Sequence, residues 1–528
     1  MSWDLSKVDF SKQRGIDDIE TGFKRWLEAR PDLPIYKSKK LAYPVFVVAA
    51  QGGGYFAAYH TALFLARLCD ACPNSANHIF AISSVSGGGL GAAVFTELLR
   101  NQPAPAVEPA RAPQSADAPV DLCYAKAPGD ATMEKAVKAF FEADLLAPVI
   151  DSMLLFDIPG LFVPPLRTGF DRAIALEQAL EDAWRKVPGV DRAKTGFEHE
   201  FFTRWQPEGT VPALFMNTTG VNYGIPVIFS QLNWSQTVGG GDALSALYRF
   251  VSKGAGNEEL DRLMEEHDYR LPTLANVLDF RPDLEIKMST AVVLSARFPY
   301  VTPPGRIARS RDIHAMPEPF KNTETMEFMD GGFADNSGRY TANGILRKLN
   351  EIATREKAMA AISLHLVAFT HARTVLESKG RNYAHHELIT PIAAFESIRA
   401  AKRSRAAEEM EWKGIKIHEV ELFDHRFEAP VSWLLSSEPK LAIELRSGGP
   451  ISPGGERQAI CCEYMLPSLP FLPFVRRKVR LPMDKDDLAK VGQARDRMKE
   501  YVPNQDVYLA MLALIRGGSR IETGSLKQ

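Results

Sequence analysis

Residues 41–54, LAYPVFVVAAQGGG, combine an apolar run with three consecutive glycines. Such a run, rich in β-branched residues, is typical of a strand buried on both faces of a parallel sheet, and the glycines are typical of a tight turn. Leu63, Phe64 and Leu68 follow at helical spacing. Residues 78–100 repeat the order of strand, glycine turn and helix as HIFAISSVS, GGG and LGAAVFTELLR. The two units predict an α/β fold in which helices cover a mainly parallel central sheet.

The composition is that of a globular protein with a large core. The chain has 528 residues, of which 45% are hydrophobic and 24% charged, and its formal net charge is −2. Because this charge balance gives no broad basic surface, nucleic acid is not an expected partner. The N-terminus lacks the apolar stretch of a secretory signal, and five cysteines at irregular spacing do not suggest a disulfide framework. We therefore expect reduced thiols and a cytoplasmic protein.

The organisation along the chain suggests one large domain with additions. Residues 1–40 are expected to form an N-terminal extension, and residues 41–528 the main domain. The tract from 101 to about 130 is rich in proline and alanine and predicts a solvated insertion. The part from about residue 375 onward is expected to be a C-terminal elaboration. Residues 213–232 predict a hairpin, and residues 361–370 predict a core strand.

Ser86 is the candidate nucleophile. A nucleophilic serine needs a sharp strand-to-helix turn, which the spacing Gly-x-Ser-x-Gly provides because glycines let the backbone approach closely. Of the three serines in SSVSGGG, residues 83–89, only Ser86 has a glycine two residues on, at Gly88, with Gly87 between them. Ser84 stands two residues before Ser86, where the pattern has glycine. A serine in a glycine-rich turn can also be structural, so the motif alone does not establish catalysis.

The glycines at residues 52–54 allow three interpretations. They could form a plain turn that needs positive φ. They also match a dinucleotide-binding pattern, Gly52-x-Gly54-x-x-Ala57, which would need an acidic residue at the end of the second strand. Asp70 has about the right offset but falls at the end of the first predicted helix. In the third interpretation, their backbone amides hold the oxyanion of an acyl transfer at a neighbouring serine.

The base that would activate such a serine is harder to choose. His365 lies inside the apolar strand AISLHLVAF and is expected to be a satisfied core histidine. Asp330 ends a predicted strand and is followed by two glycines. Because a carboxylate with an ordinary pKa of about 3.9 is a weak base for an alcohol, Asp330 would have to be desolvated and held against the serine hydroxyl. A Ser-His-Asp triad that uses another histidine remains an alternative.

Four blocks in this order resemble the patatin-like phospholipase family. They are AAQGGGYFAA, SSVSGGGLGAAV, MSTAVVLSARFPYVTP and FMDGGFADNSG, at residues 49–58, 83–94, 288–303 and 328–338. The resemblance implies a three-layer α/β/α sandwich with a mainly parallel sheet and insertions, residues 41–528 being the catalytic domain. It also implies hydrolysis of acyl esters in phospholipids or related lipids by a Ser-Asp dyad, with no metal or organic cofactor.

The resemblance assigns roles residue by residue. Ser86 is the implied nucleophile and Asp330 the implied base. The implied oxyanion hole is the loop Gly52, Gly53 and Gly54, in which the amides of Gly53 and Gly54 bind the oxyanion and Gly52 shapes the loop; Gly87 and Gly88 form the implied nucleophile elbow.

The sequence departs from the family pattern at three places. Phe56 stands where the family usually has Arg or Lys, Ser84 replaces a glycine, and Asn336-Ser337-Gly338 replaces an Asn-x-Pro-like ending. A catalytically silent lipid-binding or scaffold protein of the same fold is therefore the alternative function, and a nucleotide-binding oxidoreductase is a further one.

The segment Leu145 to Arg167, LLAPVIDSMLLFDIPGLFVPPLR, is strongly apolar. Its proline and aspartate residues argue against a membrane span. A helix packed over the core is the simpler interpretation. The second is that part of the segment lines an acyl channel or contacts a bilayer, because lipid substrates reside at an interface. We accordingly expect a lipid as partner and peripheral contact with a membrane surface; the sequence does not indicate an oligomeric state.

Overall fold

A computed structural model of the chain describes part of its residues. These are residues 16–102, 132–162, 171–221, 225–233, 275–279, 283–298, 301–308, 325–356, 361–371, 415–423 and 504–517, together with 281, 440, 443, 444, 447, 519 and 520. The predicted insertion at 101–130 lies outside the described residues except for its first two. Most of the predicted C-terminal elaboration also lies outside them.

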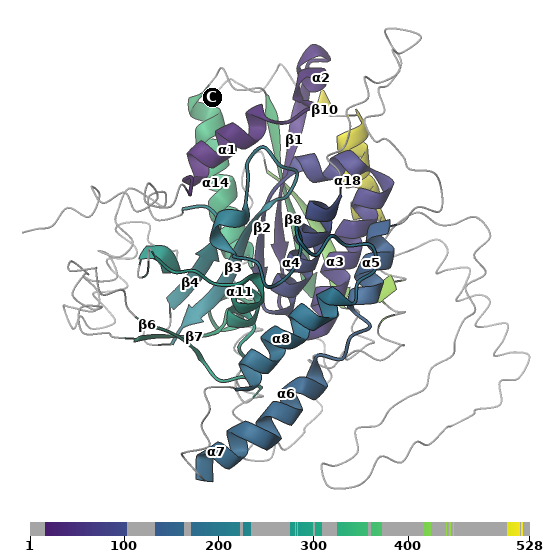
Figure 1. Ribbon diagram of the computed structural model, residues 1–528. Coiled ribbons are helices and arrows are strands. Elements are labelled where there is room, and N and C mark those ends of the chain that lie inside the picture. Colours follow the sequence, from purple (N-terminus) through teal and green to yellow (C-terminus); the bar gives the residue numbers. More distant parts are fainter. Residues whose placement is uncertain are drawn as a thin grey trace, which may run out of the picture.

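A central, mostly parallel sheet organises the described part of the chain (Figure 1). Its main path follows the order β5-β4-β3-β2-β1-β8-β9, and β6, β7 and β10 pair outside this path. The pairs β1–β2, β1–β8, β2–β3, β4–β5 and β8–β9 are parallel. The strands are β1 (Leu41–Ala50), β2 (Ile79–Val85), β3 (Ala213–Gly220), β4 (Ile225–Ser230), β5 (Ala275–Asn276), β6 (Gly305–Ala308), β7 (Thr325–Asp330), β8 (Ile362–His371), β9 (Lys416–Phe423) and β10 (Ser519–Arg520).

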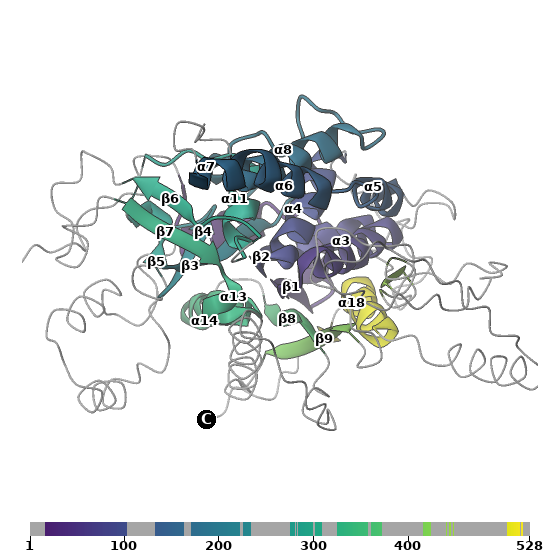
Figure 2. The ribbon, with the colours of Figure 1, turned by 90° about the horizontal axis from the view of Figure 1, so that it is seen from below.

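Helices lie on both faces of this sheet, as the view from below makes plain (Figure 2). One face carries α3 (Gly54–Ala71), α4 (Gly87–Asn101), α5 (Thr132–Phe140), α6 (Leu146–Ser152), α8 (Arg172–Arg185) and α11 (Met288–Ser295). The other carries α1 (Ile19–Glu28) and α14 (Arg339–Arg355). The remaining helices used below are α2 (Leu33–Ser38), α7 (Ile158–Phe162), α13 (Gly332–Asp335) and α18 (Gln505–Gly517).

The side chains of β1 divide the core into two layers. Phe46, Val48 and Ala50 belong to the cluster under α3 and α4, whereas Val45 and Val47 belong to the cluster under α1 and α14. Successive residues of a strand point to opposite faces, so an apolar run without alternation is needed when both faces are covered. This arrangement confirms the α/β fold with a mostly parallel sheet, and it is compatible with a three-layer sandwich.

Several local predictions from the sequence are confirmed. The first strand spans Leu41–Ala50, as its apolar run predicts. The predicted hairpin is the antiparallel pair β3–β4, and the predicted core strand is β8. The MSTAVVLS stretch, which begins the third of the four blocks, forms the helix Met288–Ser295.

The cysteines and the surface bear on the expected location. Cys69 is a buried free thiol, but Cys72 is disulfide-bonded, so the expectation of reduced thiols is wrong for Cys72.

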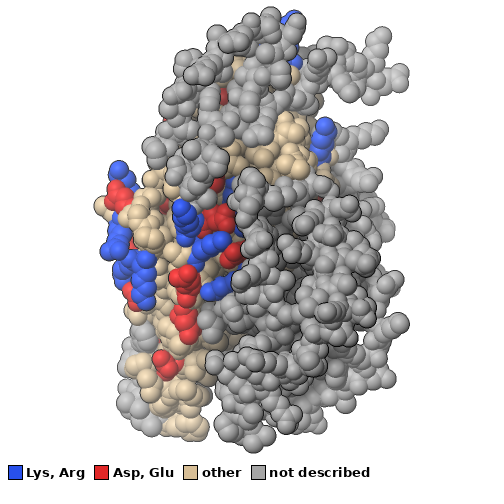
Figure 3. Space-filling model, turned by 90° about the vertical axis from the view of Figure 1, so that its right-hand side faces the viewer, with Lys and Arg blue, Asp and Glu red and all other residues tan. Residues whose placement is uncertain are grey.

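Among the described residues, no helix combines the length and apolar character needed to cross a bilayer. On the face seen in Figure 3, acidic and basic side chains lie close to one another.

Candidate active site

Ser86 lies in a sharp turn between β2 and α4. Its backbone has φ 51° and ψ −123°, a region that non-glycine residues rarely adopt. The Ser86 amide donates a hydrogen bond to Ser295 Oγ at 3.0 Å. The Ser86 carbonyl accepts hydrogen bonds from the amides of Gly89, at 2.9 Å, and Leu90, at 3.3 Å. Backbone strain held in this way at a strand-to-helix turn is the geometry of a nucleophile elbow.

The three serines of this stretch have different surroundings. Ser83 Oγ donates to the Gly338 carbonyl at 2.7 Å, and Ser84 Oγ contacts the sulfur of Met216 at 3.2 Å. Ser86 Oγ makes no hydrogen bond to any residue that the structure describes, and 6% of Ser86 is exposed. The first two hydroxyls therefore serve the packing of β2, and the third is available for chemistry.

The glycines after Ser86 allow the first turn of α4 to contact the loop after β1. A Cβ added to Gly87 would lie 1.8 Å from the carbonyl oxygen of Gly54. A Cβ at Gly88 would lie 2.3 Å from the carbonyl oxygen of Ala50. Because real Cβ atoms do not come this close, no other residue fits either position without displacing the backbone. The predicted elbow glycines are thus required by close packing.

We expect Gly87→Ala to lower the free energy of unfolding by about 3 kcal/mol, because the added methyl group overpacks a rigid backbone contact. Gly89→Ala is the matched control in the same helical turn. Its Cβ would lie 3.2 Å from its nearest neighbour, the sulfur of Met216, which can shift. Urea denaturation of both variants measures the difference, and equal stability of the two would contradict the interpretation.

The Gly52–Gly54 loop lies against the serine. A Cβ added to Gly52 would lie 3.2 Å from Ser86 Cβ and 2.4 Å from Asn336 Oδ1. The Gly52 amide donates to the Asn336 carbonyl at 3.0 Å, which fixes the loop. Gly54, at φ +62°, begins α3. The amides of Gly53 and Gly54 donate to no acceptor among the described residues, so they can donate to a bound anion.

Asp330 ends β7 and reaches the same place from the opposite direction. Along one side of β3, residues 215–220 pair with β4. Because a strand has only two sides, β2 and β7 share the other side of β3. There, Val85 is the partner of Asn217, and Asp330 is the partner of Thr218. The carboxyl ends of β2 and β7 therefore meet beside consecutive residues of β3, and Ser86 is the residue after Val85.

Ser295, on α11, connects the two strand ends. Its hydroxyl accepts the Ser86 amide hydrogen bond and donates to the Asn217 carbonyl at 2.7 Å. Its carbonyl accepts a hydrogen bond from the Gly331 amide at 3.2 Å. Asp330 is 1% exposed, and its Oδ1 accepts a hydrogen bond from the Gly332 amide at 2.7 Å. One serine thus positions both the elbow and the Asp-Gly-Gly turn.

Asn217, on β3, connects β2 to α14 beneath the candidate site. Asn217 Nδ2 donates to Ser83 Oγ at 3.0 Å and to the Ser84 carbonyl at 2.9 Å. Asn217 Oδ1 accepts from Thr341 Oγ1 at 2.6 Å. Sequence reasoning did not single out Asn217 or Ser295. A signal was present, because polar side chains in the middle of the buried strand ALFMNTTG need partners.

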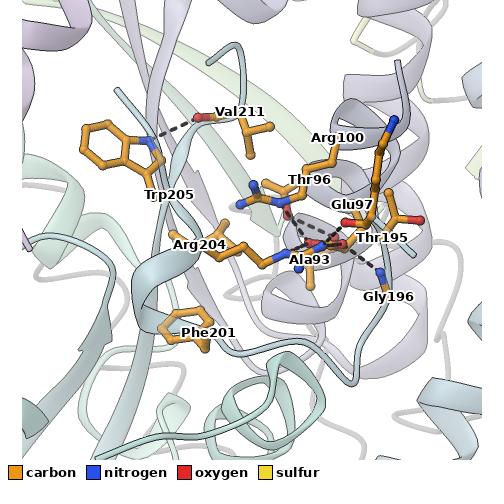
Figure 4. A network of polar contacts seen from close by, with 12 residues as sticks. Ala93, Thr96, Glu97, Arg100, Thr195, Gly196, Phe201, Arg204, Trp205 and Val211 are labelled. Atoms are coloured by element: carbon orange, nitrogen blue, oxygen red, sulfur yellow. Dashed lines mark hydrogen bonds and ion pairs between the residues drawn. The ribbon is translucent and has the colours of Figure 1, made fainter. Parts of the chain in front are cut away.

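A buried ion-pair network fixes α4, the helix that follows Ser86 (Figure 4). Glu97 is fully buried. It accepts hydrogen bonds from Arg204 Nη2 at 2.8 Å, from Arg100 Nε at 3.1 Å and from the Gly196 amide at 2.9 Å. This network ties α4 to the chain around residues 195–204, and Figure 4 shows Glu97 and Arg100 of α4 beside Gly196 and Arg204.

We expect Glu97→Gln to destabilise the protein by about 3 kcal/mol, because it leaves Arg100 and Arg204 largely buried without their negative partner. Chemical denaturation measures this loss. Glu351→Gln is the control, since Glu351 is 55% exposed on α14 and should change stability by less than about 0.5 kcal/mol. Equal losses in the two variants would show that the buried network contributes no more to the free energy of unfolding than an exposed ion pair does.

The residues on which the rival functions depend have structural roles. Asp70 lies in the last turn of α3 and accepts hydrogen bonds from the amides of Met133 and Glu134 at 3.1 and 2.8 Å. It caps α5 and does not lie at the end of β2, where a ribose-binding carboxylate would be needed. Ser86 makes no hydrogen bond to a histidine within the described residues.

His365 is a satisfied core residue, as the sequence predicts. It pairs with Phe46 in the β1–β8 ladder, four residues before the end of β1. Its Nε2 lies 3.0 Å from Ser363 Oγ and its Nδ1 lies 3.2 Å from His418 Nε2. Burial, with a smaller contribution from His418, lowers the pKa of His365 to about 3.

This depressed pKa predicts a loss of stability in mild acid. Below pH of about 6.5 the unfolded chain binds a proton at His365 that the folded chain does not bind until pH nears 3. Stability should therefore fall as pH drops, by about 2 kcal/mol at pH 5 from this residue. Urea unfolding of wild type and of His365→Gln at pH 7 and pH 5 measures this loss of stability. If the variant loses as much stability between pH 7 and pH 5 as wild type does, His365 is not the cause of the loss.

Comparisons of the sequence with models of protein families and with curated proteins gave no match. Within the described residues, no group of three or more His, Cys, Asp or Glu side chains is arranged to hold a metal ion. The functional assignment therefore rests on the geometry around Ser86 and on the chemistry that this geometry allows.

Proposed function

We propose that this chain is a serine acyl hydrolase that cleaves carboxylic ester bonds of phospholipids or related lipids. One observation carries the proposal. The carboxyl ends of β2 and β7 meet beside Asn217 and Thr218 of β3. Ser86, in the backbone geometry of a nucleophile elbow, directly follows the end of β2, and Asp330 ends β7. A buried carboxylate at the neighbouring strand end, and a serine whose hydroxyl makes no hydrogen bond among the described residues, are the minimum that a two-residue mechanism needs.

The mechanism follows from these positions. Asp330 accepts the hydroxyl proton of Ser86 while Oγ attacks the ester carbonyl carbon, and the resulting oxyanion accepts hydrogen bonds from the amides of Gly53 and Gly54. The intermediate then expels the alcohol, which takes the proton from Asp330. Water attacks the seryl ester in the same way and releases the fatty acid. The N-termini of α3 and α4 both adjoin Ser86 and favour the developing negative charge.

The four-block resemblance to patatin-like phospholipases supports lipids as the substrate class. The residue that differs most from that pattern, Phe56, is 3% exposed and packs in the core with its ring 6.5 Å from that of His60. Position 56 therefore offers no positive charge to a lipid phosphate. Other residues would have to bind that phosphate. This departure leaves the Ser86–Asp330 pair and the glycine loop intact.

Labelling with a fluorophosphonate, followed by mass spectrometry of the labelled peptide, tests the proposal. We expect the label on Ser86 and release of fatty acid from phospholipid vesicles and from soluble esters. Labelling of another serine would overturn the assignment of the nucleophile. If the protein neither reacts nor releases fatty acid, the alternative of a catalytically silent lipid-binding or scaffold protein is favoured.

A further inference from the structure

Residues 146–162 form an apolar arm that consists of α6, the π-helix η4 (Met153–Asp157) and α7. The arm exposes large apolar side chains to solvent: Leu154 is 54% exposed, Leu155 67% and Phe162 80%. Ile150, Phe156 and Ile158 are exposed by 38–39%. A soluble protein rarely leaves a contiguous apolar surface of this kind uncovered unless it binds something there. The expectation that this segment packs over the core therefore fails for the six exposed side chains, whereas Val149 and Ser152 are buried as it predicts.

The arm is anchored at its base and points away from the sheet. Val149 is 3% exposed and Ser152 is 2% exposed, so the start of the arm is packed against the body. The carboxyl ends of β1 and β2 point toward the lower end of the molecule in Figure 1, and α7 forms the tip at that end. Figure 2, seen from below, shows α6 and α7 on the viewer's side. The arm and the candidate active site thus lie toward the same end of the molecule.

The charges of the arm indicate what kind of surface it suits. Its only ionisable residues are Asp151 and Asp157, and Asp157 forms an ion pair with Arg172 of α8. Figure 3 shows the lower end of the described surface as mostly tan, with charged side chains gathered above it. The arm has no lysine or arginine that would attract anionic lipids. Leu154, Leu155 and Phe156 are exposed consecutively around the helix, which suits immersion in an apolar medium better than contact with one flat surface.

We propose that the apolar arm inserts into the surface of a zwitterionic lipid bilayer and so brings the edge of the sheet that carries Ser86 to its substrate. That the membrane lipid is the substrate of Ser86 rests on the proposed function. Insertion buries Leu154, Leu155 and Phe162 among acyl chains, and this burial supplies the binding free energy.

The arm is connected to the turn that carries Asp330. Arg172, the ion-pair partner of Asp157, donates through Nε to the carbonyl of Val301 at 2.8 Å. The Val301 amide donates to the Phe298 carbonyl at 3.2 Å. The Phe298 ring lies 6.5 Å from that of Phe333, three residues after Asp330. The Arg172 contacts therefore position the arm relative to the candidate active site.

Flotation with phosphatidylcholine vesicles tests the arm directly. We expect wild type to float and the triple variant Leu154→Glu, Leu155→Glu, Phe162→Glu to lose vesicle affinity by at least about 100-fold. Leu509→Glu is the matched control, since Leu509 is 50% exposed on α18, away from the arm, and this variant should float like wild type. Circular dichroism checks that each variant is folded. Failure of wild type to float, or undiminished flotation of the triple variant, would overturn the proposal.

Two further measurements separate this proposal from its alternatives. Hydrolysis of vesicle phosphatidylcholine and of soluble 4-nitrophenyl butyrate is compared, and the ratio of the two rates should fall at least about tenfold in the triple variant. If wild type floats but hydrolyses neither substrate, the proposed function fails while the membrane arm stands. If wild type is a dimer by sedimentation, the triple variant a monomer and neither floats, the arm binds a second copy and the bilayer proposal is overturned.

Discussion

Asp330→Asn is expected to lower the rate of ester hydrolysis by about 10³- to 10⁴-fold, because an amide of the same shape cannot accept the proton of Ser86. Asp330 is 1% exposed, and its Oδ1 is held by the Gly332 amide at 2.7 Å. This hydrogen bond can persist to the amide oxygen of asparagine. The variant should therefore fold normally, and the loss should appear in kcat with little change in KM.

A neighbouring aspartate provides the control. Asp335 is five residues away, in α13, and its carboxylate accepts hydrogen bonds from Ser337 Oγ at 2.6 Å and from the Tyr340 amide at 3.1 Å. Asp335→Asn should retain hydrolysis within about tenfold of wild type, because Asp335 stabilises the start of α14 and has no role in the reaction. Rates of soluble ester hydrolysis measure both variants. If Asp330→Asn keeps more than about a tenth of the wild-type rate, another base acts on Ser86.

The elements around the site could be predicted because each depends on local sequence. The run Leu41–Ala50 has no charged residue and is almost wholly apolar, which indicates a strand buried on both faces, and the glycines at 52–54 and 87–89 indicate turns where backbones approach closely. The position of Ser86 between a strand and a helix followed from the same local pattern. The end of β7 at Asp330 was likewise indicated by the following two glycines.

The close approach of the ends of β2 and β7 could not be predicted from local sequence. It depends on the pairing of Thr218 with Asp330, which are 112 residues apart, and on β4 occupying the other side of β3. Strand order is decided by packing between distant segments, and a periodicity carries no information about it. The role of Ser295 was hidden for the same reason, since its partners lie in the turn after β2, on β3 and in the turn after β7.

Ser86→Ala is expected to abolish fluorophosphonate labelling and to lower ester hydrolysis by at least about 10⁴-fold, because no covalent acyl-enzyme can form without Oγ. Ser84→Ala is the control of equal size. Its hydroxyl contacts the sulfur of Met216 and the carbonyl of Phe215 on β3, so this variant should keep both labelling and turnover. Loss of labelling in Ser84→Ala with retention in Ser86→Ala would reverse the assignment.

The backbone at Ser86 separates a catalytic role from a structural one. At φ 51° and ψ −123°, alanine bears the same strain as serine, whereas glycine adopts these angles without it. Ser86→Gly should therefore raise the free energy of unfolding relative to Ser86→Ala by about 1 kcal/mol, and we expect both variants to be inactive. Urea denaturation measures this difference. Higher stability of Ser86→Gly than of Ser86→Ala would show that the fold holds position 86 in a strained backbone conformation, as a nucleophile elbow requires. Equal stability of the two variants would argue that the elbow is unstrained.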